Sequence, residues 1–254
     1  MLAHRVIPAL LLSDGGLVKT RRFRDAVYLG DPINVIKIFN NKEVDELIVL
    51  DIDASPDRKA PDMDAIRLFA DECFMPVCYG GGIRSVAQVE EIIHTGIEKV
   101  SFNTAAIETP TLLSDAARAV GSSSVVGSMD VSRDLLGRYR VHTARGRKNT
   151  GTSPEDHARK LEDLGCGEIL VNSIDRDGMM DGYDTALISR VAKSVNVPII
   201  AMGGAGNIDH LAQGVRTGAQ AVAAGSMFVF QGVNRAVLIS YPPYSELERR
   251  LAAA

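Results

Sequence analysis

Two observations predict that this chain folds as a closed (β/α)8 barrel, the α/β TIM-barrel class. The first is an internal repeat: an apolar strand ending in glycines, an amphipathic helix and a second strand begin at Pro76, and the same series begins again at Pro198. The second is the rhythm of the chain, in which apolar runs alternate with helical stretches roughly every 30 residues. About eight such units in two similar halves favour a closed barrel over an open doubly wound sheet.

The repeat keeps a constant offset of 122 residues, which is the mark of an internal duplication. Matching pairs are Gly81 and Gly203, Gly82 and Gly204, and Thr104 and Ser226. No stretch has the composition of a linker between domains. We therefore expect one barrel domain over residues 1–254, with half-barrels at about 1–120 and 121–254.

The composition excludes several classes of function. Hydrophobic residues make up 46% and charged residues 24% of the 254 positions, as in a protein with a full core. The net charge is −4 and the only basic cluster is residues 21–24, which argues against nucleic acid as a partner. The 3 cysteines show no CxxC spacing, so we expect neither a metal site nor a disulfide frame, and no cofactor. Without a long apolar run or a signal-peptide pattern, we expect a cytoplasmic protein that does not bind membranes.

The first elements follow from local patterns. Residues 5–12 form a continuous apolar run, as expected of a strand buried on both faces. A polar loop carrying Lys19 comes next. Asp31 and Pro32 are a helix cap and a first helical residue, so a helix is expected from there to about residue 44. A second strand is expected over residues 46–53.

The later elements repeat the same alternation. Helix starts are indicated by Thr109-Pro110 and Ser153-Pro154, and a helix end by Gly96. Residues 135–148 read as a polar β-excursion with a turn at Gly137. The remaining strands are expected near residues 76–80, 99–102, 125–130, 168–173, 198–202 and 221–224, with helices near 62–73, 85–95, 184 onward, 209–217 and a last one ending at 251.

The residues that follow the strands are candidates for chemistry, because the active site of such barrels lies at the carboxyl ends of the strands. Glycines there let the backbone approach a ligand, and helix N-termini point N–H groups at anions. The alternative is that the glycines only make tight turns. Because the loops at Gly82 and Gly204 are duplicated, we favour two phosphate sites, and hence a long ligand phosphorylated at both ends.

Asp130 closes an apolar strand by itself, where a general acid or base would be held rigidly. The alternative role is to cap the following loop. Alignment of the two halves places Leu11 at the equivalent position of the first half. Leucine cannot transfer a proton. The second acidic residue that the two-fold repeat leads us to expect, equivalent to Asp130, is therefore absent.

Charged residues stand among the first residues of strands, at the opposite end of the barrel. They are Arg5, Glu46, Lys99 and Glu168. Charges at that end normally serve solubility and stability. If these four point into the barrel axis instead, two charges of each sign would close the bottom and still admit a small polar molecule.

Over nearly its whole length the sequence resembles the cyclase subunits of imidazole glycerol phosphate synthase, from histidine biosynthesis. The motifs that carry the resemblance are Gly30-Asp31-Pro32, Gly80 to Arg84, Asn103 to Ala106, Asp175-Arg176-Asp177-Gly178 and Gly203 to Gly206. The resemblance implies a heterodimer with a glutaminase subunit, which docks at the barrel bottom near Glu98. Its ammonia crosses the barrel and attacks a bis-phosphorylated ribulosyl-formimino aminoimidazole carboxamide ribotide, giving imidazole glycerol phosphate and aminoimidazole carboxamide ribotide.

The resemblance also implies roles for single residues. Asp130 matches one of two catalytic aspartates, and Lys19 matches the lysine of a mobile loop. The ammonia gate corresponds to Arg5, Glu46, Lys99 and Glu168. One phosphate site corresponds to Gly82, Asn103 and Thr104, and the other to Asp177, Gly178, Gly204, Gly225 and Ser226.

The departure from the family is Leu11, which stands where the family has its other catalytic aspartate. Loss of one acid–base group commonly lowers the rate about 10²–10⁴-fold. Two hypotheses therefore stay open: a cyclase with altered chemistry, in which Asp14 or Asp51 could replace the missing acid, or an ammonia-channel subunit without cyclase activity. The second resembles divergent relatives from surface-polysaccharide (O-antigen) gene clusters, where a glutaminase–barrel pair supplies ammonia for amidination of an acetamido sugar.

Overall fold

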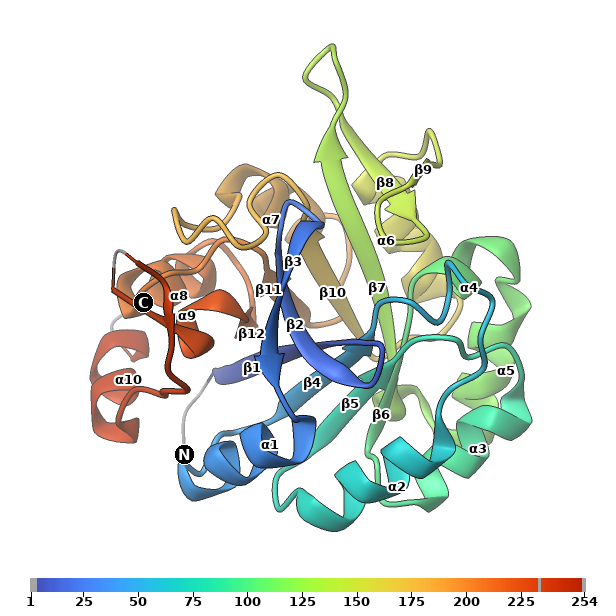
Figure 1. Ribbon diagram of the computed structural model, residues 1–254. Coiled ribbons are helices and arrows are strands. Elements are labelled where there is room, and N and C mark those ends of the chain that lie inside the picture. The colour runs from blue at the N-terminus through green and yellow to red at the C-terminus, as the bar shows by residue number, and fades with distance from the viewer. Residues whose placement is uncertain (1–3, 233, 253–254) are drawn as a thin grey trace.

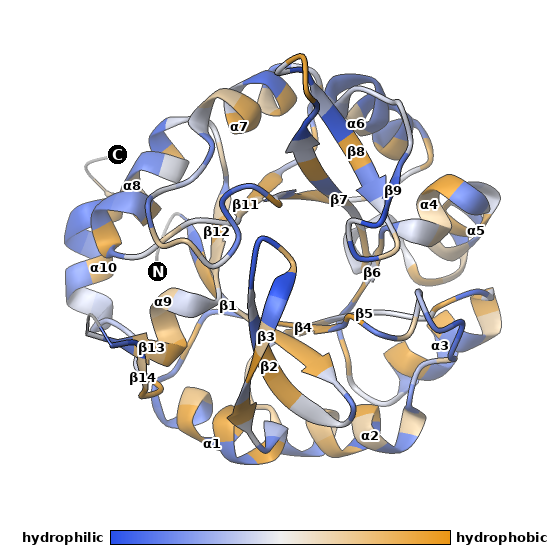
Figure 2. Ribbon diagram, turned by 45° about the horizontal axis from the view of Figure 1, so that its top comes forward, coloured by the Kyte–Doolittle hydropathy of each residue, from blue (hydrophilic) through white to orange (hydrophobic). Residues whose placement is uncertain are grey.

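Eight parallel strands form a closed ring in the computed structural model, which describes residues 4–232 and 234–252 (Figures 1 and 2). In spatial order these are β1 (Arg5–Ser13), β4 (Leu47–Asp51), β5 (Val77–Gly80), β6 (Lys99–Phe102), β7 (Val125–Arg133), β10 (Glu168–Ser173), β11 (Ile199–Met202) and β12 (Ala221–Ala224). The ring closes where β12 pairs with β1, with Ala223 opposite Ile7. The predicted (β/α)8 barrel is confirmed.

Helices surround the ring on its outer side (Figure 2). They are α1 (Pro32–Asn41), α2 (Met63–Glu72), α3 (Val86–His94), α4 (Thr104–Glu108), α5 (Thr111–Val120), α6 (Pro154–Asp163), α7 (Thr185–Ala192), α8 (Ile208–Arg216), α9 (Ser226–Val229) and α10 (Tyr244–Leu251). The expected caps are present: the side chains of Asp31 and Ser153 accept backbone N–H groups three residues on. The short helices α4 and α9, which directly follow β6 and β12, were not predicted. Within the described residues, no helix is both long and apolar enough to cross a membrane.

Two hairpins rise from the carboxyl ends of the strands. The first comprises β2 (Gly16–Arg21) and β3 (Arg24–Gly30), and the second extends β7 through β8 (Tyr139–Thr143) and β9 (Lys148–Asn149). The second was predicted, and it stands well above the barrel in Figure 1. The first corrects the prediction of a polar loop around Lys19, because β2 pairs with β1 and buries its side chains from Leu17 to Thr20.

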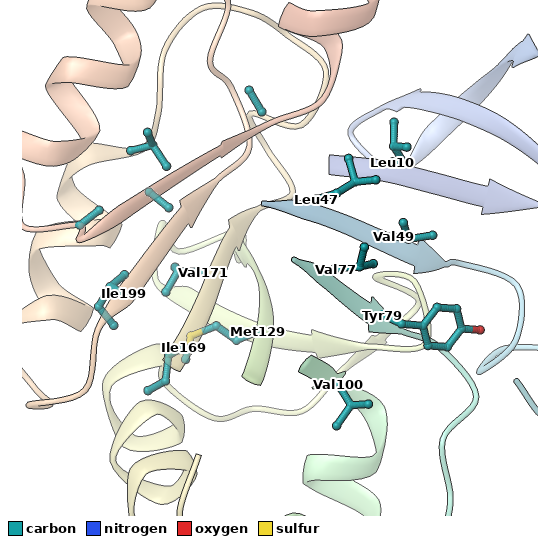
Figure 3. Close-up of a cluster of buried hydrophobic side chains, with 14 of the residues drawn as sticks. Leu10, Leu47, Val49, Val77, Tyr79, Val100, Met129, Ile169, Val171 and Ile199 are labelled. Carbon is teal, nitrogen blue, oxygen red and sulfur yellow. The ribbon is translucent and has the colours of Figure 1, made fainter. Parts of the chain in front are cut away.

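Alternation along the strands divides the core into two layers. Side chains such as Leu10, Val49 and Val171 face the helices and form the larger cluster, part of which is shown in Figure 3. Their neighbours point into the barrel and form a smaller, separate cluster. Its members are Ile7, Ala9, Ile48, Cys78, Val126, Leu170, Ile200, Met202, Ala221 and Ala223. The interior of the barrel is therefore lined by apolar side chains.

The two halves share hydrogen bonds at the same offset as their sequences. The side chain of Glu98 accepts from the backbone N–H of Val77 (2.7 Å), and 122 positions later Gln220 accepts from Ile199 (2.8 Å). Each bond ties the start of one strand to the loop before the next strand. Glu98, which the resemblance places at the docking surface of a partner, thus also has a local task in the fold.

Candidate functional site

The carboxyl ends of the strands surround two adjoining hollows at the barrel mouth. The first encloses about 870 Å³ including its open side. Of the residues predicted for phosphate binding, Gly82, Asn103 and Thr104 line this first hollow together with Asp130. The second hollow is smaller and is lined by Lys19, Gly178, Gly204, Gly225 and Ser226. Leu11, Asp177 and Met202 line both. The two predicted groups are thus separate clusters at one mouth.

Asp130 lies in β7 between two amide side chains. Asn103 Nδ2 donates to one carboxylate oxygen (2.8 Å) and Asn172 Nδ2 to the other (3.2 Å). Burial, together with the negative charge of Asp177, raises the pKa of Asp130 to about 7, although the two hydrogen bonds act to lower it. A carboxyl group with this pKa can both give and take a proton near neutral pH, as a general acid or base must.

Leu11 occupies the wall shared by the two hollows and is only 6% exposed. It forms an apolar patch there with Leu50 and Met202. Neither Asp14 nor Asp51, the two candidates to replace the missing acid, is well placed for that role. Asp14 sits exposed in the turn between β1 and β2 and lines neither hollow. Asp51 does line the first hollow, but one of its oxygens accepts two backbone N–H groups of the following turn (3.0 and 2.9 Å), and burial raises its pKa.

Lys19 is buried at the second hollow, with 4% of its surface exposed. Its ammonium group donates to the carbonyl oxygen of Ala9. Burial lowers the pKa of Lys19 to about 8, although the charge of Asp177 opposes this shift. Gly225 leaves the room that the lysine needs, because a Cβ there would lie 2.5 Å from Nζ. Lys19 is therefore a cation held at the hollow predicted to bind a phosphate.

The glycines at the mouth are required by contacts between loops. Gly82 has a φ of +72°, and a Cβ would lie 2.6 Å from the carbonyl oxygen of Lys59. Gly204 has a φ of +116°, and its Cβ would lie 2.1 Å from the carbonyl oxygen of Gly182. Tight packing of loops thus accounts for both glycines, and both also border a hollow.

Asn172 and Arg145 are among the polar residues of the first hollow that sequence reasoning missed. Asn172 follows Leu170 with the two-residue period of a strand and lies opposite Asp130 in the β10–β7 pairing, so alternation could have found it. Arg145 comes from the turn between β8 and β9, where no pattern marked it. In the described part of the chain, no three His, Cys, Asp or Glu side chains gather closely enough to hold a metal ion.

At the other end of the barrel, the four predicted charged residues meet in one ring. Arg5 donates to Glu46 and, over 2.5 Å, to Glu168. Lys99 Nζ lies 3.2 Å from both oxygens of Glu46 and 3.1 Å from Glu168. Glu46 is only 2% exposed, and the two glutamates keep the pKa of Arg5 above its ordinary value despite burial. These charges therefore face one another rather than the solvent.

Comparison with known proteins shows the family of this chain. Residues 5–234 match the histidine biosynthesis protein family. The chain belongs to this family. A Pseudomonas aeruginosa protein, provisionally named as subunit hisF2 of imidazole glycerol phosphate synthase, is 52% identical over 249 residues, which cover 98% of this chain and 99% of that protein.

Two further members of the family are similar over almost as much of the chain. A Leptospira interrogans protein, provisionally named as the HisF subunit of the same synthase, is 46% identical over 98% of both chains. The Alkaliphilus metalliredigens protein named as the HisF subunit is 40% identical over 92% of this chain and 93% of its own length. The resemblance to synthase subunits that the sequence indicated is thus confirmed.

Proposed function

We propose that this chain is the ammonia-accepting barrel subunit of a glutamine-dependent complex, and that a glutaminase docks at the charged-ring end, near Glu98. The relatives support the assembly with a second subunit, because they are named as subunits of imidazole glycerol phosphate synthase. The ring of Arg5, Glu46, Lys99 and Glu168 supports the entry point, because it lies where the inner core of the barrel begins.

The inner core suits the passage of neutral ammonia. Its members are apolar, and Ala9, Ala221 and Ala223 leave little side chain in the axis. An ammonium ion would pay a large desolvation penalty there, so an apolar axis favours ammonia over its charged form. Ser101 and Ser128, both buried further along the axis, supply hydroxyl groups on the way to the mouth.

The mouth suits an anionic small molecule. Gly82, Asn103 and Thr104 would hold one phosphate group at the first hollow. The second group would lie at the second hollow beside Lys19, among Asp177, Gly178, Gly204, Gly225 and Ser226. The side chains at the second hollow include a cation, which a phosphate needs for tight binding.

Leu11 supports one of the two roles open to this subunit over the other. It lines the first hollow together with Asp130 and cannot exchange a proton, while both hollows are kept. We therefore favour an ammonia channel that delivers to a separate acceptor enzyme. The resemblance to relatives from surface-polysaccharide clusters names one such acceptor, an enzyme that amidinates an acetamido sugar.

The second candidate is the cyclase reaction itself, and Asp130 favours it. A carboxyl group with a pKa near 7, held by two amide donors, is suited to acid–base work. With a single such group, the cyclase would run about 10²–10⁴-fold slower than with two.

One set of variants separates the two candidates. Wild type, Leu11→Asp and Asp130→Asn are supplied with ammonium and the bis-phosphorylated substrate, and imidazole glycerol phosphate is measured. The channel role predicts no turnover by wild type above Asp130→Asn, a gain of activity in Leu11→Asp, and stimulation of a glutaminase by wild type. Turnover by wild type that Asp130→Asn abolishes would establish the cyclase instead. Failure to bind any glutaminase subunit would exclude both.

A further inference from the structure

Arg145 reaches over the first hollow from the turn between β8 and β9. Its Nη1 lies 2.8 Å from Oδ1 of Asp53, which follows β4. The other oxygen of Asp53 accepts from Ser13 Oγ at the end of β1 (2.6 Å). Both members of the ion pair keep about a fifth of their side chains exposed, 19% and 20%. The guanidinium thus sits at the edge of the hollow, paired but within reach of solvent.

The charge around the first hollow is unbalanced without Arg145. Three carboxylates line the hollow, those of Asp51, Asp130 and Asp177, whereas Arg145 is the one cation among the described residues that line it. A phosphate group entering the hollow would meet neutral donors from Asn103 and Thr104 but mostly negative charge beyond them. Repulsion between like charges at short range is large in a partly buried site, so a bound anion needs a cation there.

The turn that carries Arg145 is docked on the predicted phosphate site itself. The backbone N–H of Ala144 donates to Thr104 Oγ1 (3.2 Å). Ala144 and Arg145 both have left-handed backbone angles, with φ of +51° and +59°. Such a conformation is unfavourable for residues with a side chain and persists where the surroundings enforce it, as at binding sites. The contacts with Thr104 and Asp53 hold this turn, and with it the arginine, over the hollow despite the strain.

We propose that Arg145 is the anion-binding residue of the first hollow. When the ligand binds, Arg145 breaks its ion pair with Asp53 and pairs with the phosphate group instead. This rests on the phosphorylated ligand of the proposed function and adds the residue that neutralises its charge. Asp53 then acts as the resting partner, which holds the guanidinium when the hollow is empty and competes with the phosphate for it. The planar guanidinium can bind two phosphate oxygens at once, as it does a carboxylate.

The experiment measures phosphate binding at each hollow separately. Amide resonances of Thr104 and Ser226 are followed by NMR while ribose 5-phosphate, or inorganic phosphate, is added at low salt. We expect Arg145→Gln to weaken binding read at Thr104 at least about tenfold and to leave binding read at Ser226 unchanged. Arg145→Lys should restore part of the loss. Asp53→Asn should tighten binding at Thr104 about fivefold, because it removes a competitor of modest strength.

Arg147→Gln is the matched control, because Arg147 is an exposed arginine of the same turn. It should bind as wild type does. Three results would overturn the proposal: wild type showing no phosphate-dependent shift at Thr104, Arg145→Gln binding as wild type, or Arg147→Gln losing as much as Arg145→Gln. The proposed channel is tested independently, by measuring how wild type and Arg147→Gln stimulate a glutaminase. Loss of stimulation in wild type with phosphate binding intact would refute only the channel.

Discussion

Asp130 shows how one residue combines a functional property with a cost in stability. Its carboxylate keeps two hydrogen bonds, yet burial raises its pKa from 3.8 to about 7. Between these values the folded protein holds a proton that the unfolded chain has released. Linkage then requires that stability falls as pH rises from about 4 to about 7 and levels off above.

Asp130→Asn should remove this pH dependence. An amide fits the site, because the Oδ1 atoms of Asn103 and Asn172 lack partners and either neighbour can turn its amide to accept. We expect wild type to lose about 1–3 kcal/mol of unfolding free energy relative to Asp130→Asn between pH 5 and pH 8. Urea denaturation of both proteins at the two pH values measures this. If the difference in unfolding free energy between wild type and Asp130→Asn were the same at both pH values, the pKa of Asp130 would not be raised by folding.

Strand ends made some residues of the site predictable and left others hidden. Asp130 could be found because it closes an apolar strand, and Leu11 because alignment of the two halves places it at the equivalent position. Arg145 could not, because it reaches the first hollow only through the path of the turn between β8 and β9. Such contacts between distant loops have no local pattern.

Among the elements, the β7–β8 hairpin depends on one buried contact for its position. The hydroxyl of Tyr139 donates to Asp184 at the start of α7 (2.7 Å) and accepts from Arg133 (2.6 Å). Asp184 also caps α7 by accepting from the backbone N–H of Leu187 (3.1 Å). The hairpin is therefore anchored at Tyr139, in the last strand pair before the turn, whereas Leu135 within the turn is exposed.

Tyr139→Phe should lower the unfolding free energy by about 1–2 kcal/mol, because Asp184 loses a donor in a buried place. Thermal or urea denaturation measures the loss. Tyr28→Phe is the control: Tyr28 is 67% exposed on β3, and its change should stay within about 0.5 kcal/mol. Equal effects of the two variants would contradict the anchoring role of Tyr139.

The β2–β3 hairpin shows why an element can be misread from sequence. Charged residues 19, 21, 22 and 24 suggested a solvated loop. In the fold, Val18 and Lys19 are buried because β1 extends past the barrel and pairs with β2, Leu11 opposite Val18. The ammonium group of Lys19 is satisfied by a backbone carbonyl, a partner that composition cannot reveal.

At the scale of the whole molecule, the charged ring joins four strands from both halves of the barrel. Glu46 is 2% exposed and depends on Arg5 and Lys99 for compensation. Breaking one partner of a buried ion pair leaves an uncompensated charge.

Lys99→Met should therefore destabilise the fold by about 2–3 kcal/mol, less than loss of an isolated buried pair because Arg5 still contacts both glutamates. Lys37→Met is the control, since Lys37 is 55% exposed and 3.7 Å from Glu72, and its effect should be within about 0.5 kcal/mol. Urea denaturation compares the two. If Lys99→Met lowered the unfolding free energy as little as Lys37→Met does, the charges of the ring would already be screened by water.

The sequence by itself determined the barrel, its repeat and its family. Continuous apolar runs, helix caps and a constant offset of 122 residues are local or one-dimensional signals, and the barrel needs little else. It also showed Leu11 where a second acid was expected. Only the tertiary structure decided how the hollows are charged: the pKa of Asp130, the burial of Lys19 and the reach of Arg145 to Asp53. These depend on desolvation and on contacts between residues far apart in the chain, which exist only once the ring has closed.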